Sequence, residues 1–396
     1  MNTTRVGPGG PRIAAYLAFT VLGCNHGGEP ADDESSSSGA ESTSSTEPPP
    51  SDDSSSESGP PEPACTTPCA DEPEVTWQTV WGGLAWESAF GVAVEGQGKI
   101  VVTGPVDWPP VGGFVQVYDS EGTQLLAMNT PEAGYDVVWD GLDSFVFVGN
   151  SPTQEGKLRR YRVDGTLISE SAPADVDATA YVIRALPEGG FVTGGGTATD
   201  GVLEYFDAAG VAIGSVTTPV DIAVNDLALT ANGVLFVGED VSGNYVAGAF
   251  DDARMLKWSD QAPALRALSI AGLTDGTVVG SFRDAQNQGS LRFYNPDGSV
   301  RTTLPLVWPG ALVTALLPVA NDQFIAAISV ESPTLHCQLA RYDSSGTQYW
   351  GVTFESIGDD NECVDLAPGL DDTLVIAGSR RGPDGDGDAW LLRIAR

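Results

Sequence analysis

From residue 76 onward, one kind of turn returns at a nearly constant interval, and this repeat constrains the fold more than any other feature. The turns end at residues 98, 143, 189, 233, 276, 322 and 372, so successive intervals are 45, 46, 44, 43, 46 and 50 residues. They carry Gly, Asn or Asp, which tolerate the positive φ of tight hairpins. Strand-like runs such as Ile100–Gly104 and Leu374–Gly378 follow them. A period of this length indicates one supersecondary unit per copy.

A second kind of turn divides the repeats further. It has an aromatic residue before an Asp- and Gly-containing turn, as in Tyr118–Gly122, Phe206–Gly210 and Tyr342–Gly346, and a degenerate copy is Phe250–Arg254. The turns delimit four strands per repeat, which is the content of one β-propeller blade. Seven copies predict an all-β fold, a seven-bladed β-propeller of four-stranded blades. The main alternative is a parallel β-helix, whose coils are about half this length and lack a regular four-strand subdivision.

The two ends of the repeat region predict how the ring closes. The last repeat stops at its third strand, Ala389–Ile394, and leaves no residues for a fourth. The segment Thr76–Trp81 precedes the first blade and resembles Thr347–Trp350 ahead of the seventh. We expect this N-terminal strand to pair with the last blade, because closure removes the open sheet edges that invite aggregation.

Residues 1–23 have the plan of a lipoprotein signal peptide. Basic Arg5 and Arg12 precede the apolar run Ile13–Leu22, which ends before Gly23-Cys24. This end resembles the lipobox of bacterial lipoproteins, which implies that Cys24 is lipidated and becomes the new N-terminus. Asn25 follows it instead of Asp, which implies an outer-membrane or cell-surface location. An ordinary signal peptide with an incidental Cys is the alternative, and no apolar run reaches the roughly 18–20 residues of a membrane-spanning helix.

Residues 24–74 are expected to be a disordered tether before the propeller at 75–396. The stretch 25–75 holds 13 acidic residues, no Lys or Arg, and runs of Ser and Pro, so it has too little apolar surface to fold. The whole chain has a net charge of −35. Such a chain repels nucleic acid, and nucleic acid is therefore excluded as a partner.

Two segments carry a resemblance to a known family. Gly387–Arg393 and Arg341–Trp350 resemble the SBBP repeat of bacterial seven-bladed β-propellers and related repeats in extracytoplasmic lipoproteins. The likeness covers about residues 75–396. It implies the propeller fold and says little about activity, because the motifs are turns and strand ends.

No catalytic residue is predicted. His336 is the one histidine after His26, and its neighbour Cys337 should point to the opposite strand face, which argues against a Cys-His pair. The glycines 194–196 are interpreted as a loose hairpin, not a dinucleotide loop. The first strands of the seven blades carry mixed residues that make no catalytic ring: Val94, Trp139, Arg184, Leu229, Ile270, Leu316 and Leu366. Tryptophans such as Trp86, Trp108, Trp139, Trp258 and Trp308 suit packing between blades better than a ligand platform.

Four cysteines remain after Cys24, and an even number in an oxidising compartment indicates two disulfides with three possible connectivities. We favour Cys65 with Cys69, which are close in sequence, and Cys337 with Cys363. The latter two should begin neighbouring strands on one face of the ring. Zinc binding by the four thiols is the alternative, although the pairs lack a common Cys-x-x-Cys spacing.

Asp384, Asp386 and Asp388 alternate with Gly as do the first ligands of a calcium loop. The match then breaks, because Ala389 stands where an EF-hand needs Gly and Ala395 where it needs Glu. A solvated hairpin turn is therefore the preferred interpretation. Calcium is the single cofactor that the sequence suggests.

Two functions remain open. The first is a monomeric, non-catalytic binding or scaffolding propeller, anchored in the membrane by lipid, with an unidentified protein, glycan or envelope partner. The second is an extracytoplasmic hydrolase or lyase with acidic residues in the propeller channel. An enzyme should gather several first-strand carboxylates at one mouth beside a cleft, whereas a binder should present a broad face.

Overall fold

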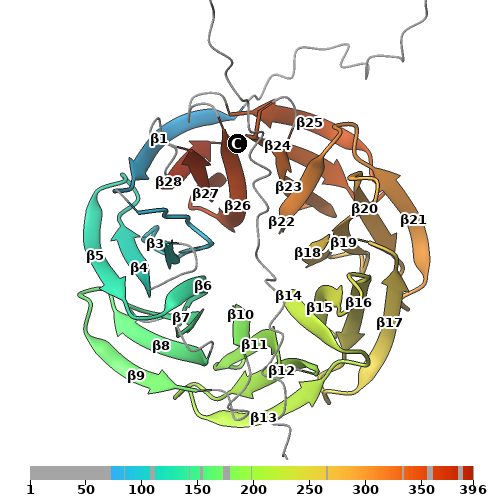
Figure 1. The fold of residues 1–396 in the computed structure, drawn as a ribbon, viewed down its shortest axis with the longest axis horizontal. Coiled ribbons are helices and arrows are strands. Elements are labelled where there is room, and N and C mark those ends of the chain that lie inside the picture. Colours follow the sequence, from blue (N-terminus) through green and yellow to red (C-terminus); the bar gives the residue numbers. More distant parts are fainter. Residues whose placement is uncertain are drawn as a thin grey trace, which may run out of the picture. The chain divides into compact units, whose positions relative to one another are not determined.

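The computed structural model describes residues 73–395, apart from 84, 108–111, 142, 152–154, 173–178, 198, 265, 332–333, 355–359 and 382–386. In this part of the chain, 28 strands form seven four-stranded antiparallel sheets. Figure 1 shows the sheets as blades of a ring, each with its first strand near the axis and its last at the rim. The predicted seven-bladed β-propeller is therefore confirmed. No helix in the described residues is long and apolar enough to cross a membrane.

The strands are given blade by blade, from the axis to the rim. Blade 1 has β2 (Gly91–Val94), β3 (Ile100–Val106), β4 (Gly112–Tyr118) and β5 (Gln124–Thr130). Blade 2 has β6 (Ala133–Trp139), β7 (Ser144–Asn150), β8 (Gly156–Arg162) and β9 (Leu167–Ser171). Blade 3 has β10 (Thr179–Ala185), β11 (Phe191–Gly196), β12 (Gly201–Phe206) and β13 (Ala212–Thr217).

Blade 4 has β14 (Ile222–Thr230), β15 (Gly233–Asp240), β16 (Tyr245–Phe250) and β17 (Leu256–Ala262). Blade 5 has β18 (Arg266–Gly272), β19 (Val278–Arg283), β20 (Gly289–Tyr294) and β21 (Val300–Pro305). Blade 6 has β22 (Ala311–Val319), β23 (Gln323–Val330), β24 (His336–Asp343) and β25 (Gln348–Thr353). Blade 7 has β26 (Asn361–Pro368), β27 (Thr373–Arg381), β28 (Gly387–Ala395) and, at the rim, β1 (Glu74–Trp81).

The N-terminal strand closes the ring as predicted. β1 pairs antiparallel with β28, with Thr79 opposite Leu391 and Trp81 opposite Ala389. The sheet order is β1-β28-β27-β26, so the first and the last of the described strands share one blade. This pairing covers the edge that β28 would otherwise expose.

The repeated turns owe their residue types to backbone conformation. All seven turns between first and second strands contain a residue with positive φ, for example Gly98 at 91° and Asp143 at 52°. The turns between third and fourth strands place Gly in the same conformation. The degenerate fourth copy keeps it too, because Arg254 adopts a φ of 62° where Gly122 adopts 85°. The side of the ring that carries both kinds of turn is called the turn face below, and the opposite side, where the first strands begin, the start face.

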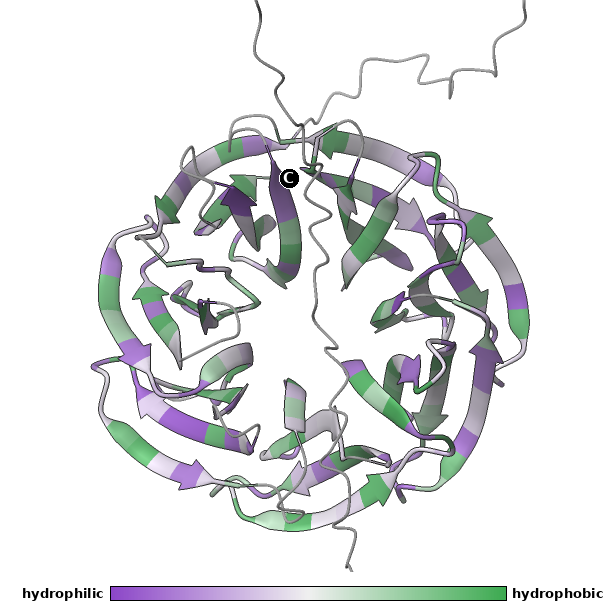
Figure 2. Ribbon diagram, viewed as in Figure 1, coloured by the Kyte–Doolittle hydropathy of each residue, from purple (hydrophilic) through white to green (hydrophobic). Residues whose placement is uncertain are grey.

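Burial follows position in the blade. The second strands β7, β11 and β15 are buried along their whole length, whereas the outermost β13 and β21 are largely exposed. Figure 2 shows polar and apolar residues alternating along the outer strands. This alternation is expected when one strand face packs on the next blade and the other meets water.

One sequence interpretation was wrong. Residues Gly194 and Gly196 do not form a hairpin but belong to the buried strand β11. A Cβ on Gly194 would stand 2.6 Å from a Val224 methyl of blade 4. The glycine allows the neighbouring blade to approach closely.

Candidate functional site

The innermost strands carry a repeated irregularity near their beginnings. In blades 2 to 7 the pairing of the first with the second strand shifts register there. Such a bulge leaves one residue unpaired and turns its side chain away from the regular pleat. The residues within the single-residue bulges are half-buried: Tyr135, Tyr181, Asn225, Thr314 and Val364.

Directly after three of these bulges stands an aspartate that joins two blades. In blade 2, Asp136 Oδ1 accepts the amide of its neighbour Val137 at 2.8 Å, and Oδ2 accepts the amide of Ile183 in blade 3 at 2.9 Å. In blade 4, Asp226 uses its two oxygens in the same way toward Leu227 and, in blade 5, Ile270. We call this arrangement an aspartate clip.

The third clip closes the ring. Asp365 of blade 7 accepts the Leu366 amide at 2.8 Å with Oδ1 and the Val92 amide of blade 1 at 2.8 Å with Oδ2. The three clips thus span three of the seven blade boundaries. Each satisfies backbone amides that a bulged or terminal strand leaves without a ladder partner.

Arg184 connects two of the clips. It lies on β10 of blade 3, and its guanidinium donates to Asp136 Oδ2 at 2.6 Å and to Asp226 Oδ1 at 2.5 Å. Its Nε also donates to the Leu227 carbonyl at 2.7 Å. Asp136, Arg184, Asp226 and Asp365 form the axial cluster, in which the guanidinium pairs with Asp136 and Asp226 and acts on Asp365 through its charge alone.

Burial controls protonation in and around this cluster. Burial, together with the charge of Asp136, raises the pKa of Asp365 to about 7. Burial also raises the pKa of Asp226, against the lowering effect of Arg184. Near the start face, burial raises the pKa of Glu239 and that of Glu362 to about 7 each. Glu239, Glu362 and Asp365 therefore change charge close to neutral pH.

The axial carboxylates were missed by sequence reasoning, which examined other positions of the same first strands. Arg184 is the one member of the cluster that the sequence analysis includes, as one of the mixed first-strand residues that make no catalytic ring. The sequence does contain a signal for these aspartates, which is their constant spacing from the repeated turn. Asp136, Asp226 and Asp365 each stand seven residues before the turn residue, at 143, 233 and 372. Each oxygen accepts at least one backbone amide, so the cluster is built to hold strands together.

A row of aromatic side chains crosses the start face over blades 1 to 3. Ring centroids lie 6.4 Å apart between Trp86 and Phe90, 6.0 Å between Phe90 and Tyr135, and 5.4 Å between Tyr135 and Tyr181. Phe90 is buried, whereas the other three rings are half-buried. Burial raises the pKa of Tyr135 above its usual range, so its hydroxyl stays protonated. These four residues are called the aromatic row.

Most of the other tryptophans pack as expected. Trp139 donates its Nε1 hydrogen to the Ala93 carbonyl of blade 1 at 3.0 Å, Trp258 stacks on Tyr294 with centroids 5.2 Å apart, and Trp308 packs against the buried cluster of blades 5 and 6. Trp108 lies outside the described residues.

One of the two predicted disulfides is present. Cys337 of β24 and Cys363 of β26 form a disulfide with a Cα–Cα distance of 5.0 Å, which joins blades 6 and 7. Both cysteines are fully buried, and neighbouring His336 is half-buried on the other strand face. Cys65 and Cys69 lie outside the described residues, as does Cys24.

The calcium loop stays a prediction. Asp384 and Asp386 lie outside the described residues. Asp388 is the second residue of β28 and accepts from Arg380 Nη2 at 3.2 Å, so part of its charge is already compensated. Within the described ranges, no group of three or more His, Cys, Asp or Glu side chains is arranged to hold a metal ion.

Comparison with known proteins identifies the architecture alone. No protein-family model and no curated protein matches the chain. Among solved structures, a chain of the mitotic checkpoint complex is similar with a TM-score of 0.58 and 15% identity, covering 85% of this chain and 97% of that one. Raptor from Chaetomium thermophilum gives 0.58 and 12% identity, covering 81% of this chain and 29% of that one. The Dos1 propeller gives 0.52 and 12%, covering 80% and 96%.

At such identities the likeness shows the fold and nothing finer. The fold and these comparisons together define the protein as a seven-bladed β-propeller. The resemblance to the SBBP repeat and to bacterial lipoproteins stays a prediction.

Proposed function

We propose that this chain is a lipid-anchored, extracytoplasmic β-propeller that acts as a binding or scaffolding module and contacts a protein or glycan partner through its start face. The aromatic row carries the proposal. Tyr and Trp combine a large apolar ring with a polar group, and they are enriched at binding interfaces. One similar propeller was solved within a mitotic checkpoint complex, which supports a role in assembly for this architecture.

Three half-buried rings in one row, with buried Phe90 between Trp86 and Tyr135, offer more contact area than isolated surface aromatics. They lie at the beginnings of strands and on the preceding loop, and the axial cluster holds those strands in register. A rigid platform loses little conformational entropy when a partner binds, and the same contacts then give a higher affinity.

The test is a capture experiment with the full-length lipoprotein. Partners are sought by pull-down with mass spectrometry and by glycan array, with the wild type beside Tyr135→Ala/Tyr181→Ala. Tyr349→Ala is the matched control, because Tyr349 is 49% exposed on the rim strand β25. We expect a partner that the control retains and the double variant loses. Equal capture by all three proteins would contradict the start-face assignment.

The anchor is a separate part of the proposal. It is supported by the residues that end in Gly23-Cys24 and by the acidic tether after them. Protein from its host should carry acyl groups on Cys24 and partition into the detergent phase, and Cys24→Ser should remove both properties. Aqueous partitioning of the wild type with no acyl mass would reject the anchor.

The alternative, a hydrolase or lyase, is favoured by one observation. Three carboxylates of first strands do gather around the axis, and Asp365 has the raised pKa of a general acid. Against this, all six carboxylate oxygens of the clips accept backbone amides. Hydrolysis of a glycan or peptide library that disappears in Asp365→Asn, with unchanged folding, would favour the enzyme.

A further inference from the structure

Large apolar side chains stand exposed on the rim of three adjacent blades. Blades 2, 3 and 4 each contribute two of them, in or directly before the turn-face end of the outermost strand, and they are 43–64% exposed. We call this set the rim patch: Leu167, Ile168, Val211, Ile213, Met255 and Leu256. Among the described residues, the outermost strands of the other four blades carry one exposed large apolar side chain each: Val75, Leu125, Val300 and Tyr349.

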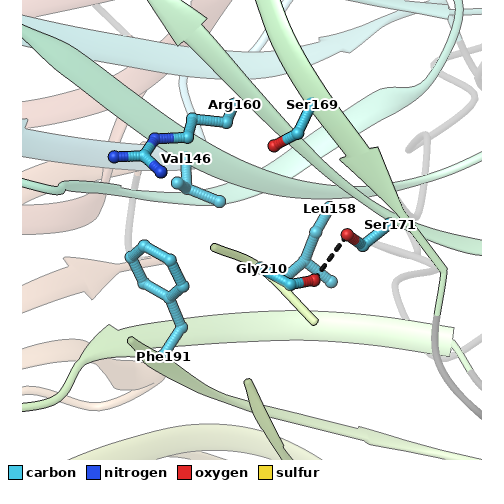
Figure 3. Close-up of a pocket in the computed structure, with 7 residues that line it drawn as sticks. All are labelled: Val146, Leu158, Arg160, Ser169, Ser171, Phe191 and Gly210. Carbon is cyan, nitrogen blue, oxygen red and sulfur yellow. Dashed lines mark hydrogen bonds between the residues drawn. The ribbon is translucent and has the colours of Figure 1, made fainter. Parts of the chain in front are cut away.

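The boundary between blades 2 and 3 holds two parts of the patch together. Figure 3 shows this boundary, where the Ser171 hydroxyl of β9 donates to the Gly210 carbonyl of the blade 3 turn at 2.6 Å. Arg160 Nη1 donates to the Ala208 carbonyl of the same turn at 3.0 Å. Val211 directly follows Gly210, so it is fixed beside β9, whose first two residues belong to the patch.

Arg254 joins blades 3 and 4 in the same part of the rim. Its guanidinium lies 4.0 Å from the centroid of the Tyr205 ring, and a Cβ on Gly214 would stand 2.8 Å from its Nη1 atom. Ile213 directly precedes Gly214, and Met255 directly follows Arg254. The apolar residues of blades 3 and 4 therefore also adjoin, and the rim patch is one continuous surface.

A continuous apolar surface is unusual on the outside of a protein, where exposed apolar residues are normally scattered singly. In the middle blade, the ten residues Ala208–Thr217 include no charged side chain. Natural proteins usually protect an exposed sheet edge with charged residues. The rim of blade 3 lacks that protection, which indicates contact with another molecule.

The curvature of the rim selects the shape of that molecule. The patch follows three of the seven blades around a closed ring, so its surface is strongly convex (Figure 1). A bilayer, or the equally convex rim of a second copy, would touch it at about one blade. An extended chain follows the curve and contacts all three blades, as segments that order on binding do when they wrap a surface.

Charge selects the composition of the chain. In the turns and outermost strands of blades 2 to 4, over residues 162–171, 207–217 and 251–262, six acidic residues stand against three basic ones. The acidic residues are Asp164, Glu170, Asp207, Asp251, Asp252 and Asp260. A partner with basic side chains between its apolar ones gains attraction from this surface, whereas an acidic partner is repelled.

We propose that the rim patch binds an extended segment of a partner protein in which apolar residues alternate with lysine or arginine. The apolar side chains of the segment cover the rim patch, and its cations face the acidic residues around it. This surface is separate from the start face, so the proposal does not depend on the aromatic row.

The test uses the full chain with Cys24→Ser, so that no acyl chain competes for the patch. The probe is the peptide acetyl-(Lys-Val)6-amide, which is about 40 Å long when extended. Acetyl-(Lys-Ser)6-amide has the same charge without the apolar side chains. Calorimetric titration near physiological salt should show that the Lys-Val peptide binds at least about tenfold more tightly than the Lys-Ser peptide.

Substitutions then locate the binding. Ile213→Ser/Leu256→Ser should abolish the preference for the Lys-Val peptide, whereas the matched control Leu125→Ser/Val300→Ser, at similarly exposed rim positions, should keep it. Val211→Ser/Met255→Ser replaces the first variant if that one does not fold. Equal affinity of the protein for both peptides, or a preference that the patch variant retains, would overturn the proposal.

Two further measurements exclude other occupants. Sedimentation equilibrium without peptide should show a monomer, and phosphatidylcholine vesicles should not retain the protein with Cys24→Ser. Dimerisation or vesicle binding that Ile213→Ser/Leu256→Ser removes would overturn the proposal, because a second copy or a lipid surface would then cover the rim patch.

Discussion

Asp365 and Val92 stand 273 residues apart in the chain, yet the Asp365 carboxylate accepts a 2.8 Å hydrogen bond from the Val92 amide. This bond joins the innermost strands of blades 7 and 1. At the rim of blade 7, β1 pairs with β28. The closure is therefore secured both near the axis and at the rim.

Replacing Asp365 with Ala should destabilise the closed ring. Two backbone amides, of Leu366 and Val92, would lose their acceptor, and we expect the free energy of unfolding to fall by about 2 kcal/mol. Urea unfolding measures it, with the exposed Asp252→Ala as control. Equal midpoints for the two variants would show that the clip contributes nothing to stability.

Stability should fall as the pH rises from about 5 to 8. Glu239, Glu362 and Asp365 have folded-state pKa values of about 7, above the unfolded values near 4. The folded state therefore binds more protons in that window, and deprotonation destabilises it. We expect the Tm at pH 5 to exceed that at pH 8 by at least about 3 °C.

Below about pH 4 the trend should reverse. Hydrogen bonds from Ser299 lower the pKa of Asp297, and those from Thr166 lower that of Asp164, so acid removes their contribution. Glu362→Gln should flatten the slope between pH 5 and 8, whereas exposed Glu121→Gln should not. A Tm that is constant or rising across that window would contradict the assignment.

Removing the disulfide should cost about 3 kcal/mol of unfolding free energy, because it closes a loop with a sequence separation of 26. Cys337→Ala/Cys363→Ala is the variant, and chemical denaturation measures the change. Peptide mapping without reductant should recover the two cysteines linked. Recovery of both as free thiols would contradict the structure.

Substitutions of Arg254 test whether the backbone of its turn is strained. Its φ of 62° is costly for a residue with a Cβ, while its guanidinium stacks over Tyr205. Both Arg254→Ala and Arg254→Gly lose the stacking on Tyr205. Alanine keeps the backbone strain of a positive φ at position 254, whereas glycine relieves that strain. The Gly variant should thus be more stable than the Ala variant by about 1 kcal/mol in urea unfolding. An Ala variant as stable as the Gly variant would show that this turn carries no strain.

The sequence predicted the fold because its constraints are local. The turn residues require positive φ, so residues such as Gly98 and Asp143 record the hairpins directly, and the missing last strand indicates β1. Cys337 with Cys363 could also be predicted from strand position. The axial cluster could not, because its contacts depend on bulges that the alternation of apolar residues does not reveal.

The most direct test of the central claim is the Kd of the full-length protein for the partner that capture identifies, measured for the wild type, Tyr135→Ala/Tyr181→Ala and Tyr349→Ala. We expect the double variant to raise the Kd at least about tenfold, as is usual for aromatic contact residues, and Tyr349→Ala to leave it unchanged. An unchanged Kd in a folded double variant would contradict a binding role for the start face.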